Sequence, residues 1–233
     1  MRDNHRYAAY FAPAVDDAWW RAGSRWLGRD AAQRHALPQP PVPGLADAVQ
    51  ARLTQAPRRY GWHATLKAPF RLAPGVDAGA LRERMRALAA GFEPFTLPPL
   101  EVCRLDDFLA LVPRPMNPAI DAIAAACVKG LQPLAAALPP AELARRRAAG
   151  LTPLEDALLL RWGYPFVLER FRFHLSLTGA LGDTEPSITE ALERTASAWF
   201  GDMPACRFQS IALFAEAQPG ADFVLIEHFQ LGA

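Results

Sequence analysis

Two stretches of the chain alternate apolar and polar residues, which is typical of strands that have one face in a core. They cover 61–67 and 171–178. Each is followed by a stripe of apolar residues at helical spacing, over 77–91 in the first case and from Ser187 onward in the second. Two more strand-like stretches come after each helix. The same order of strand, helix, strand, strand is therefore predicted twice.

The duplicated order predicts an α+β fold with two lobes related by a pseudo-twofold axis. We expect a single bilobal domain over 1–233, with two facing antiparallel sheets and outer helices. The first lobe would lie mainly in 14–113 and the second mainly in 150–233, with a strand at 6–12 able to cross over to the second lobe. The closing strands of the lobes are predicted at 95–104 and 108–113, and at 206–215 and 222–231.

Capping residues and prolines place the remaining helices and loops. The strings TPLE at 152–155 and SITE at 187–190 are both capping boxes, which predicts that helices begin there. The segment PQPPVPG at 38–44 is predicted as a loop, because proline lacks the amide donor that a helix or central strand needs. The other predicted helices cover 45–53, 118–138 and 141–149, together with one that is capped by Asp16 or Asp17 and stops at Gly28.

The composition is that of a globular protein, with 51% hydrophobic and 21% charged residues over 233 positions. The formal net charge is only +1, whereas proteins that grip long nucleic acid or anionic membranes usually carry a clear basic excess. We therefore expect a small, locally held anion as ligand. The segment MRDNHRYAAYFAP lacks the apolar core of a secretory signal, and no apolar run approaches the roughly 18 residues of a membrane span, so a cytoplasmic location is expected.

Two histidine strings of the same kind lie within the two opening strands: HATL at 63–66 and HLSL at 174–177. Because side chains alternate along a strand, His63 shares a face with Thr65, and His174 shares a face with Ser176. Trp62 should face away from that side. Each strand is therefore expected to present an imidazole and a hydroxyl to one side.

Cleavage of a phosphodiester needs one group that takes a proton and another that protonates the leaving oxygen. Two imidazoles can fill both roles near neutral pH, because their unperturbed pKa is about 6.5. Hydroxyl donors can stabilise the charged phosphoryl oxygens without a metal. We therefore predict no metal and no cofactor. The predicted catalytic residues are His63, Thr65, His174 and Ser176.

Five further residues are candidates for substrate binding. Strand alternation places Lys67 with the first histidine and Arg172 with the second. Arg59 and Tyr60 lie just before the first motif and could close on a phosphate or a sugar, although a solvated basic turn is an equally good interpretation. Tyr10 in the first strand could stack on a base or ribose, although such aromatics more often pack a core. The arginine run at 145–147 is interpreted as a solvated helix face that could help to steer an anion.

The strings RYGWHATLKAPF and FRFHLSLTG, together with the duplicated layout, resemble the two-histidine (2H) phosphoesterase superfamily. Its signature is a pair of H-x-T/S-hydrophobic strings in two pseudo-symmetric lobes. The wider strings are most similar to a bacterial branch described as phosphonate-metabolism proteins. The resemblance covers nearly the whole chain and implies a metal-independent phosphodiesterase or cyclic phosphodiesterase. It carries over the same four catalytic residues, with serine as a permitted variant in the second motif.

Three functions remain open on the sequence. The first is a hydrolase of a small cyclic or diester phosphate, such as a ribosyl phosphate that arises in phosphonate breakdown. The second is an enzyme that opens 2′,3′-cyclic phosphates at RNA ends, against which the +1 charge argues. The third is a non-catalytic protein that binds a phosphorylated metabolite. No G-x-x-x-x-G-K-S/T, G-x-G-x-x-G or H-E-x-x-H string occurs, so nucleotide triphosphates, dinucleotides and zinc proteolysis lack support.

Overall fold

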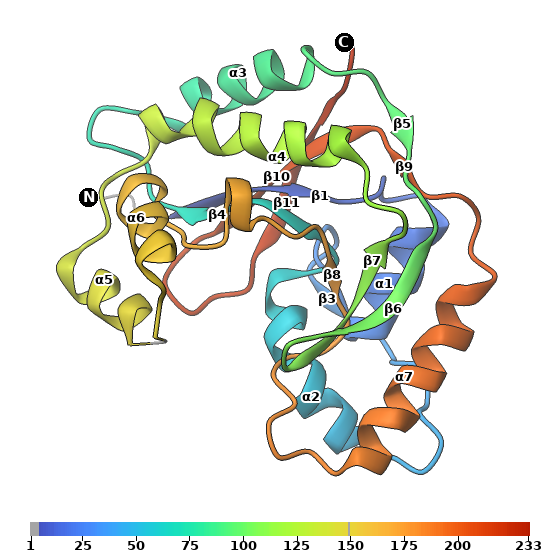
Figure 1. Ribbon diagram of the computed structural model, residues 1–233. Coiled ribbons are helices and arrows are strands. Elements are labelled where there is room, and N and C mark those ends of the chain that lie inside the picture. The colour runs from blue at the N-terminus through green and yellow to red at the C-terminus, as the bar shows by residue number, and fades with distance from the viewer. Residues whose placement is uncertain (1–4, 149) are drawn as a thin grey trace.

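Seven antiparallel strands form one sheet in the order β11-β10-β1-β4-β8-β7-β6 (Figure 1). The computed structural model describes residues 5–148 and 150–233. The predicted α+β class with antiparallel pairing is confirmed, and the two predicted sheets are joined edge to edge where Ala64 pairs with Leu175. The strands of this sheet are β1 (Arg6–Phe11), β4 (Ala64–Phe70), β6 (Leu100–Leu105), β7 (Phe108–Pro113), β8 (Leu175–Ser176), β10 (Ser210–Glu216) and β11 (Val224–Gln230).

Each histidine motif lies beside a hairpin from the other half of the chain. β4 begins directly after His63 and is continued in the sheet by β1 and then by the C-terminal hairpin of β10 and β11. β8 begins directly after His174 and pairs with β7, which forms a hairpin with β6. The two motifs therefore meet in the middle of the sheet, at the seam between these two groups of strands.

Helices cover the sheet, and α3 and α4 lie side by side across one of its faces (Figure 1). On that face α4 contacts β4 and α3 contacts β11, whereas α7 packs against β6. The helices are α1 (Ala18–Leu27), α2 (Asp47–Tyr60), α3 (Ala78–Ala89), α4 (Pro118–Leu131), α5 (Pro140–Arg147), α6 (Pro153–Trp162) and α7 (Pro186–Gly201). The remaining short elements are β2 (Arg29–Asp30) paired with β3 (His35–Ala36), β5 (Phe95–Thr96) paired with β9 (Arg207–Phe208), and the 3₁₀ turns η1 (Gln132–Leu134) and η2 (Leu168–Arg170).

The backbone before the first motif is anchored in the core by Trp62. Its side chain is fully buried and faces away from the side of His63, as expected. The indole ring stacks on Phe200, with the ring centroids 5.5 Å apart. Gly23 in α1 allows this close approach, because a Cβ atom there would lie 1.9 Å from the indole. Burial of two large aromatic rings contributes strongly to stability, so the position of the first motif is tightly fixed.

α2 extends beyond the predicted 45–53 helix, through Pro57 to Tyr60, and runs directly into the first motif. A proline inside a helix cannot donate to the carbonyl four residues earlier, which is that of Leu53. This carbonyl instead accepts a hydrogen bond of 2.7 Å from the amide of Gly179. Because Gly179 follows the second motif, the end of that segment is held against the helix that leads into the first motif.

The second motif lies in a much shorter strand than the predicted 171–178. Only Leu175–Ser176 pair as a strand, and residues 168–170 form a 3₁₀ turn. β4 carries a bulge next to this point, where Tyr10 and Ala9 of β1 pair with Thr65 and Lys67. A β-bulge bends its strand and interrupts the ladder at that point.

Other predicted boundaries shift for local reasons. The capping box at 152–155 is confirmed and begins α6, but the one at 187–190 is wrong, because α7 begins at Pro186. The predicted strand 95–104 is divided at Pro98-Pro99, which lack amide donors. The helix predicted over 118–138 ends at Leu131 and continues as η1, and that over 141–149 is α5, with Ala149 outside the described residues. Within the described part of the chain, every helix is too short or too polar to span a bilayer.

Candidate active site

The register between β4 and β8 brings the two histidine motifs onto one face of the sheet. Ala64 pairs with Leu175, and both side chains are buried. One step along the antiparallel register, His63 lies opposite Ser176 and Thr65 lies opposite His174. Residues opposite each other, and residues two apart on one strand, point to the same face. The two imidazoles therefore lie on a diagonal, for which antiparallel strands give about 7–8 Å between Cα atoms.

These four side chains line two adjoining cavities, which we call the histidine cleft. A cavity of about 440 Å³ is lined by His63, Thr65 and Ser176, among others. A second cavity of about 300 Å³ is lined by Thr65 and His174, among others. Both cavities share Thr65, Phe108 and Tyr164, together with Ala68. A ligand of moderate size could therefore contact both imidazoles at once.

Both imidazole rings are oriented by the same backbone contact. His63 Nδ1 lies 2.8 Å from the carbonyl oxygen of Gly61, and His174 Nδ1 lies 2.8 Å from that of Arg172. A carbonyl oxygen can only accept, so each Nδ1 donates its proton and each Nε2 carries the lone pair in the neutral ring. The Thr65 hydroxyl lies 3.3 Å from His63 Nε2. The first motif therefore offers a proton acceptor with a hydroxyl beside it, and Ser176 of the second motif lines the same cavity as His63.

Three of the five residues predicted to bind substrate line the histidine cleft. Tyr10 stacks on His63, with the ring centroids 3.8 Å apart, and Tyr60 lines the same cavity. Arg172 lines the cavity of His174 and forms an exposed ion pair of 2.8 Å with Asp106. The other two, Lys67 and Arg59, lie elsewhere.

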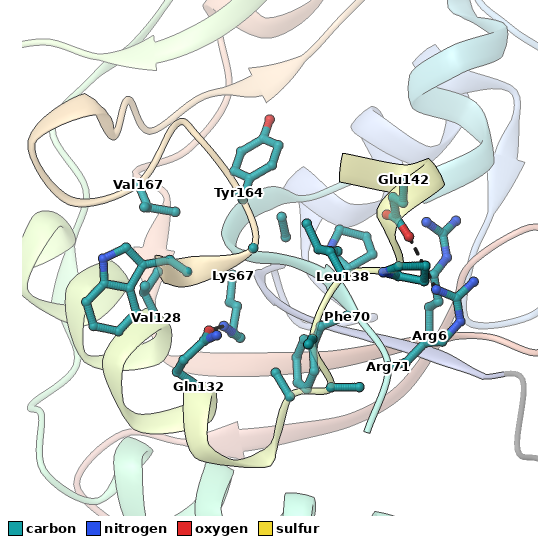
Figure 2. Close-up of a pocket in the computed structure, with 18 residues that line it drawn as sticks. Arg6, Lys67, Phe70, Arg71, Val128, Gln132, Leu138, Glu142, Tyr164 and Val167 are labelled. Carbon is teal, nitrogen blue, oxygen red and sulfur yellow. Dashed lines mark hydrogen bonds and ion pairs between the residues drawn. The ribbon is translucent and has the colours of Figure 1, made fainter. Parts of the chain in front are cut away.

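The expectation that Lys67 shares the face of His63 is wrong. Thr65 lies opposite Tyr10 but Lys67 lies opposite Ala9, so the bulge at Leu66 turns the lysine to the other face of the sheet. Lys67 is only 3% exposed, and its Nζ donates to Gln132 Oε1 over 2.8 Å. Figure 2 shows the ammonium directed toward Gln132, away from Tyr164. Strand alternation fails here because the sequence carries no sign of the bulge.

The prediction that Arg59 binds substrate in the cleft is also wrong. Its guanidinium forms an ion pair with the buried carboxylate of Glu216, and its Nε donates to the carbonyl oxygen of Ala221 over 3.1 Å. It also lies over the ring of Tyr60, 5.2 Å from the centroid. Arg59 therefore lies behind the wall of the cleft and supports Tyr60.

Residues 65–224 match the DUF1045 family, which is described as a protein of unknown function. The chain belongs to the DUF1045 family. A relative in Janthinobacterium sp. (strain Marseille), named ribose 1,5-bisphosphate phosphokinase PhnN, is 40% identical over 222 residues, which are 94% of this chain and 49% of the relative. One of the same name in Laribacter hongkongensis (strain HLHK9) is 39% identical over 220 residues, 94% of this chain and 50% of the relative. The chain thus spans about half the length of these curated relatives.

A structure titled "Crystal structure of phosphoesterase" aligns with 97% of this chain and 98% of its own. The TM-score is 0.42 and the sequence identity is 14%.

Burial lowers the pKa of both histidines in this DUF1045 site. The pKa of His63 is lowered to about 4, mainly by the loss of hydration. The hydrogen bond to the Gly61 carbonyl raises this pKa, whereas the charge of His174 lowers it further. For His174 the loss of hydration lowers the pKa, again against the effect of a carbonyl, that of Arg172. The positive charge of Arg172 also lowers the pKa of His174. Without a ligand both rings are therefore neutral near pH 7.

We expect the free energy of unfolding to decrease as the pH falls from 6.5 to about 4. The folded-state pKa of His63 lies below its unfolded value, so the unfolded chain binds the additional proton in this interval. The stabilisation is full above the unfolded pKa and is lost toward the folded one. Urea denaturation of wild type and His63→Asn at about pH 7 and about pH 4.5 measures it. Wild type should lose more stability between these two pH values than His63→Asn. The control is His35→Asn on the exposed strand β3, which should behave like wild type. Equal losses in wild type and His63→Asn would contradict the assignment to His63.

Three arginines at this DUF1045 cleft were not among the predicted site residues. Arg6 of β1 and Arg145 and Arg146 of α5 line the same cavity as His63. The interpretation of the run at 145–147 as a solvated helix face is wrong for Arg146, whose side chain is only 16% exposed. The run of three arginines was the signal for these residues, but it did not show that α5 folds back over the motifs. In the described ranges 5–148 and 150–233, no three His, Cys, Asp or Glu side chains are grouped as metal ligands.

Proposed function

We propose that this chain is a metal-independent phosphodiesterase that acts on a small phosphorylated metabolite and opens cyclic or diester phosphates. One observation carries the proposal. Two imidazoles that are oriented by equivalent backbone carbonyls line two adjoining cavities, together with the hydroxyl residues Thr65 and Ser176. The resemblance of the two motifs to 2H phosphoesterases supports it.

The proposed reaction is an in-line displacement at phosphorus. Water attacks the phosphorus while one neutral Nε2 takes its proton, and the other imidazole, protonated, gives a proton to the leaving oxygen as the P–O bond breaks. Each proton transfer typically contributes about 10²- to 10⁴-fold. The hydroxyls of Thr65 and Ser176 and the guanidinium of Arg172 would stabilise the phosphoryl oxygens.

The environments of the two rings support different roles. His63 is stacked on Tyr10 and has a pKa of about 4, so the ring is neutral near pH 7 and its Nε2 can accept a proton. His174 lies 5.3 Å from the ring of Phe108, in the cavity that Arg172 shares. The negative charge of a bound phosphate would favour a protonated ring at this position. We therefore propose His63 as the base and His174 as the acid.

The curated relatives support a phosphorylated sugar as substrate class. Their name states that those longer proteins act on ribose 1,5-bisphosphate. This chain matches about half of each, and it lacks the G-x-x-x-x-G-K-S/T string by which many kinases hold ATP phosphates. We therefore propose diester opening, and not phosphoryl transfer from ATP, for the half that this chain represents. Phosphonate catabolism is the proposed setting.

The proposal is tested by offering the purified protein a panel of cyclic and diester phosphates with EDTA present. We expect release of a phosphomonoester from at least one small cyclic phosphate, at a rate that EDTA does not change. Binding of a panel member, seen as thermal stabilisation without turnover, would instead identify a non-catalytic binding protein. An RNA oligonucleotide with a 2′,3′-cyclic end belongs in the panel. Preference for it, with steep salt dependence, would identify an RNA-end enzyme.

A further inference from the structure

A single carboxylate on α5 holds three arginines beside the histidine cleft. Glu142 lies 2.8 Å from Arg146, 3.3 Å from Arg71 and 3.8 Å from Arg145. Burial raises the pKa of Glu142, but the hydrogen bonds and charges of Arg146 and Arg71 outweigh this and lower it. The carboxylate is therefore ionised near pH 7. One negative charge against three positive charges leaves two positive charges without a partner in this cluster.

Two of these three arginines, Arg145 and Arg146, face the cavity of His63. Arg145 and Arg146 line that cavity together with Arg6, and among the described residues that line it none is an aspartate or a glutamate. Arg6 is paired with Glu216, whose carboxylate is fully buried. The surface that a ligand meets on this side is therefore basic, although the whole chain has a net charge of only +1.

The arginines of α5 differ in how firmly they are held. Arg146 donates to the carbonyl oxygen of Gly163 over 3.0 Å and lies over the ring of Tyr164, 5.7 Å from its centroid. Its Nε is buried and lacks a hydrogen-bond partner in the described residues. Arg145 is 74% exposed, and its ion pair with Glu142 is long, at 3.8 Å. A fixed guanidinium beside an adjustable one is an arrangement that can close on an anion.

We propose that Arg145 and Arg146 of α5 form a second anion subsite, which binds a phosphate monoester on the substrate while the diester reacts between His63 and His174. This inference rests on the proposed function of the cleft. Guanidinium groups suit phosphate because their donors form paired, charge-assisted hydrogen bonds with its oxygens. A phosphate monoester carries close to two negative charges near pH 7, which matches the surplus of this cluster. The substrate would therefore be a small molecule with two phosphoryl groups.

The neighbouring pocket in Figure 2 shows how the cluster is held. Glu142 projects from α5 toward Arg71, and Arg6 lies nearby on the same side. Lys67 is directed to the opposite side and is separate from the cluster. The subsite is therefore assigned to α5, and Arg145 is the residue whose removal tests it with the least risk to the fold.

Two probes that differ by one phosphate test the proposal: adenosine 2′,3′-cyclic phosphate with and without a phosphate on its 5′-oxygen. The measured quantity is the ratio of kcat/KM for the two probes. In wild type the 5′-phosphorylated probe should be preferred by about tenfold, mainly through KM. Arg145→Gln should bring the ratio close to one, and Arg145→Lys should keep part of it. Arg147→Gln is the matched control, because Arg147 lies on the same helix but pairs with Asp156 and is absent from the cavity lining.

The outcomes separate the subsite from the catalytic function. The subsite is supported if Arg145→Gln loses the preference for the 5′-phosphorylated probe and Arg147→Gln keeps it. A ratio near one in wild type, or the same ratio in all variants, overturns it. If wild type cleaves neither probe, the proposed function fails for this substrate class, and the ratio of Kd values from calorimetry then decides the subsite by the same comparison.

Discussion

Replacement of His63 or His174 by alanine is expected to reduce the rate of diester cleavage by about 10²- to 10⁴-fold in each case. Each variant removes one of the two proton transfers and leaves the partner ring in place. The fold should survive, because each ring is half-buried and its Nδ1 bonds only to a backbone carbonyl within its own segment. Groups that act as a unit are not additive, so the double variant should be little slower than the slower single variant.

The measurement is kcat on the best substrate of the panel, with circular dichroism and urea denaturation to establish that each variant is folded. His35→Ala on the exposed strand β3 is the control, because it removes a histidine that lies outside the cleft. Full activity in either active-site variant would refute a mechanism that uses both imidazoles. A loss of activity without a loss of binding would agree with it.

Substitution of Gly61 by alanine is expected to lower both stability and activity. Gly61 ends α2 with φ 81° and ψ 178°, a conformation that is essentially restricted to glycine. A Cβ atom there would also lie 2.5 Å from the Cβ of Ala31. Backbone strain and overpacking together should cost about 3 kcal/mol of the free energy of unfolding. Because the Gly61 carbonyl orients His63, the ring should also be displaced and kcat should fall.

Two further variants separate the causes of this effect. Gly75 also has a positive φ of 83°, but nothing lies within 4 Å of a Cβ placed there, so Gly75→Ala tests backbone strain alone. The pair Gly61→Ala and Ala31→Gly removes the clash and should recover part of the stability. Urea denaturation and kcat are measured on all of them. Equal stability of Gly61→Ala and wild type would show that this turn adapts without strain.

The sequence was sufficient for those parts of the site that depend on local spacing. An imidazole and a hydroxyl two residues apart share a face wherever the backbone is extended, and this holds for both motifs although β8 is only two residues long. The repeated order of elements also placed the two motifs in corresponding positions. From these features the α+β class could be predicted.

Features that depend on distant parts of the chain could not be predicted. The face of Lys67 depends on how β4 bulges against β1, and nothing in the local string records this. Arg145 and Arg146 of α5 line the cleft, and α4, in the same segment between the two halves, packs on β4. Tertiary packing sets this arrangement, and the local sequence does not show it. α2 continues past the predicted 45–53 helix and through Pro57, and a distant amide meets the carbonyl that this proline leaves free.

Pro57 has no amide hydrogen, so it cannot donate a hydrogen bond to the carbonyl oxygen of Leu53 within the helix. The Leu53 carbonyl has no competitor from its own helix, so it is reserved for the amide of Gly179. A residue with an N–H at this position could donate to the same oxygen from within the helix, which would weaken the hydrogen bond that joins the helix before His63 to the segment after His174. The spacing of the two imidazoles, which are far apart in the sequence, therefore depends in part on the amide hydrogen that Pro57 lacks.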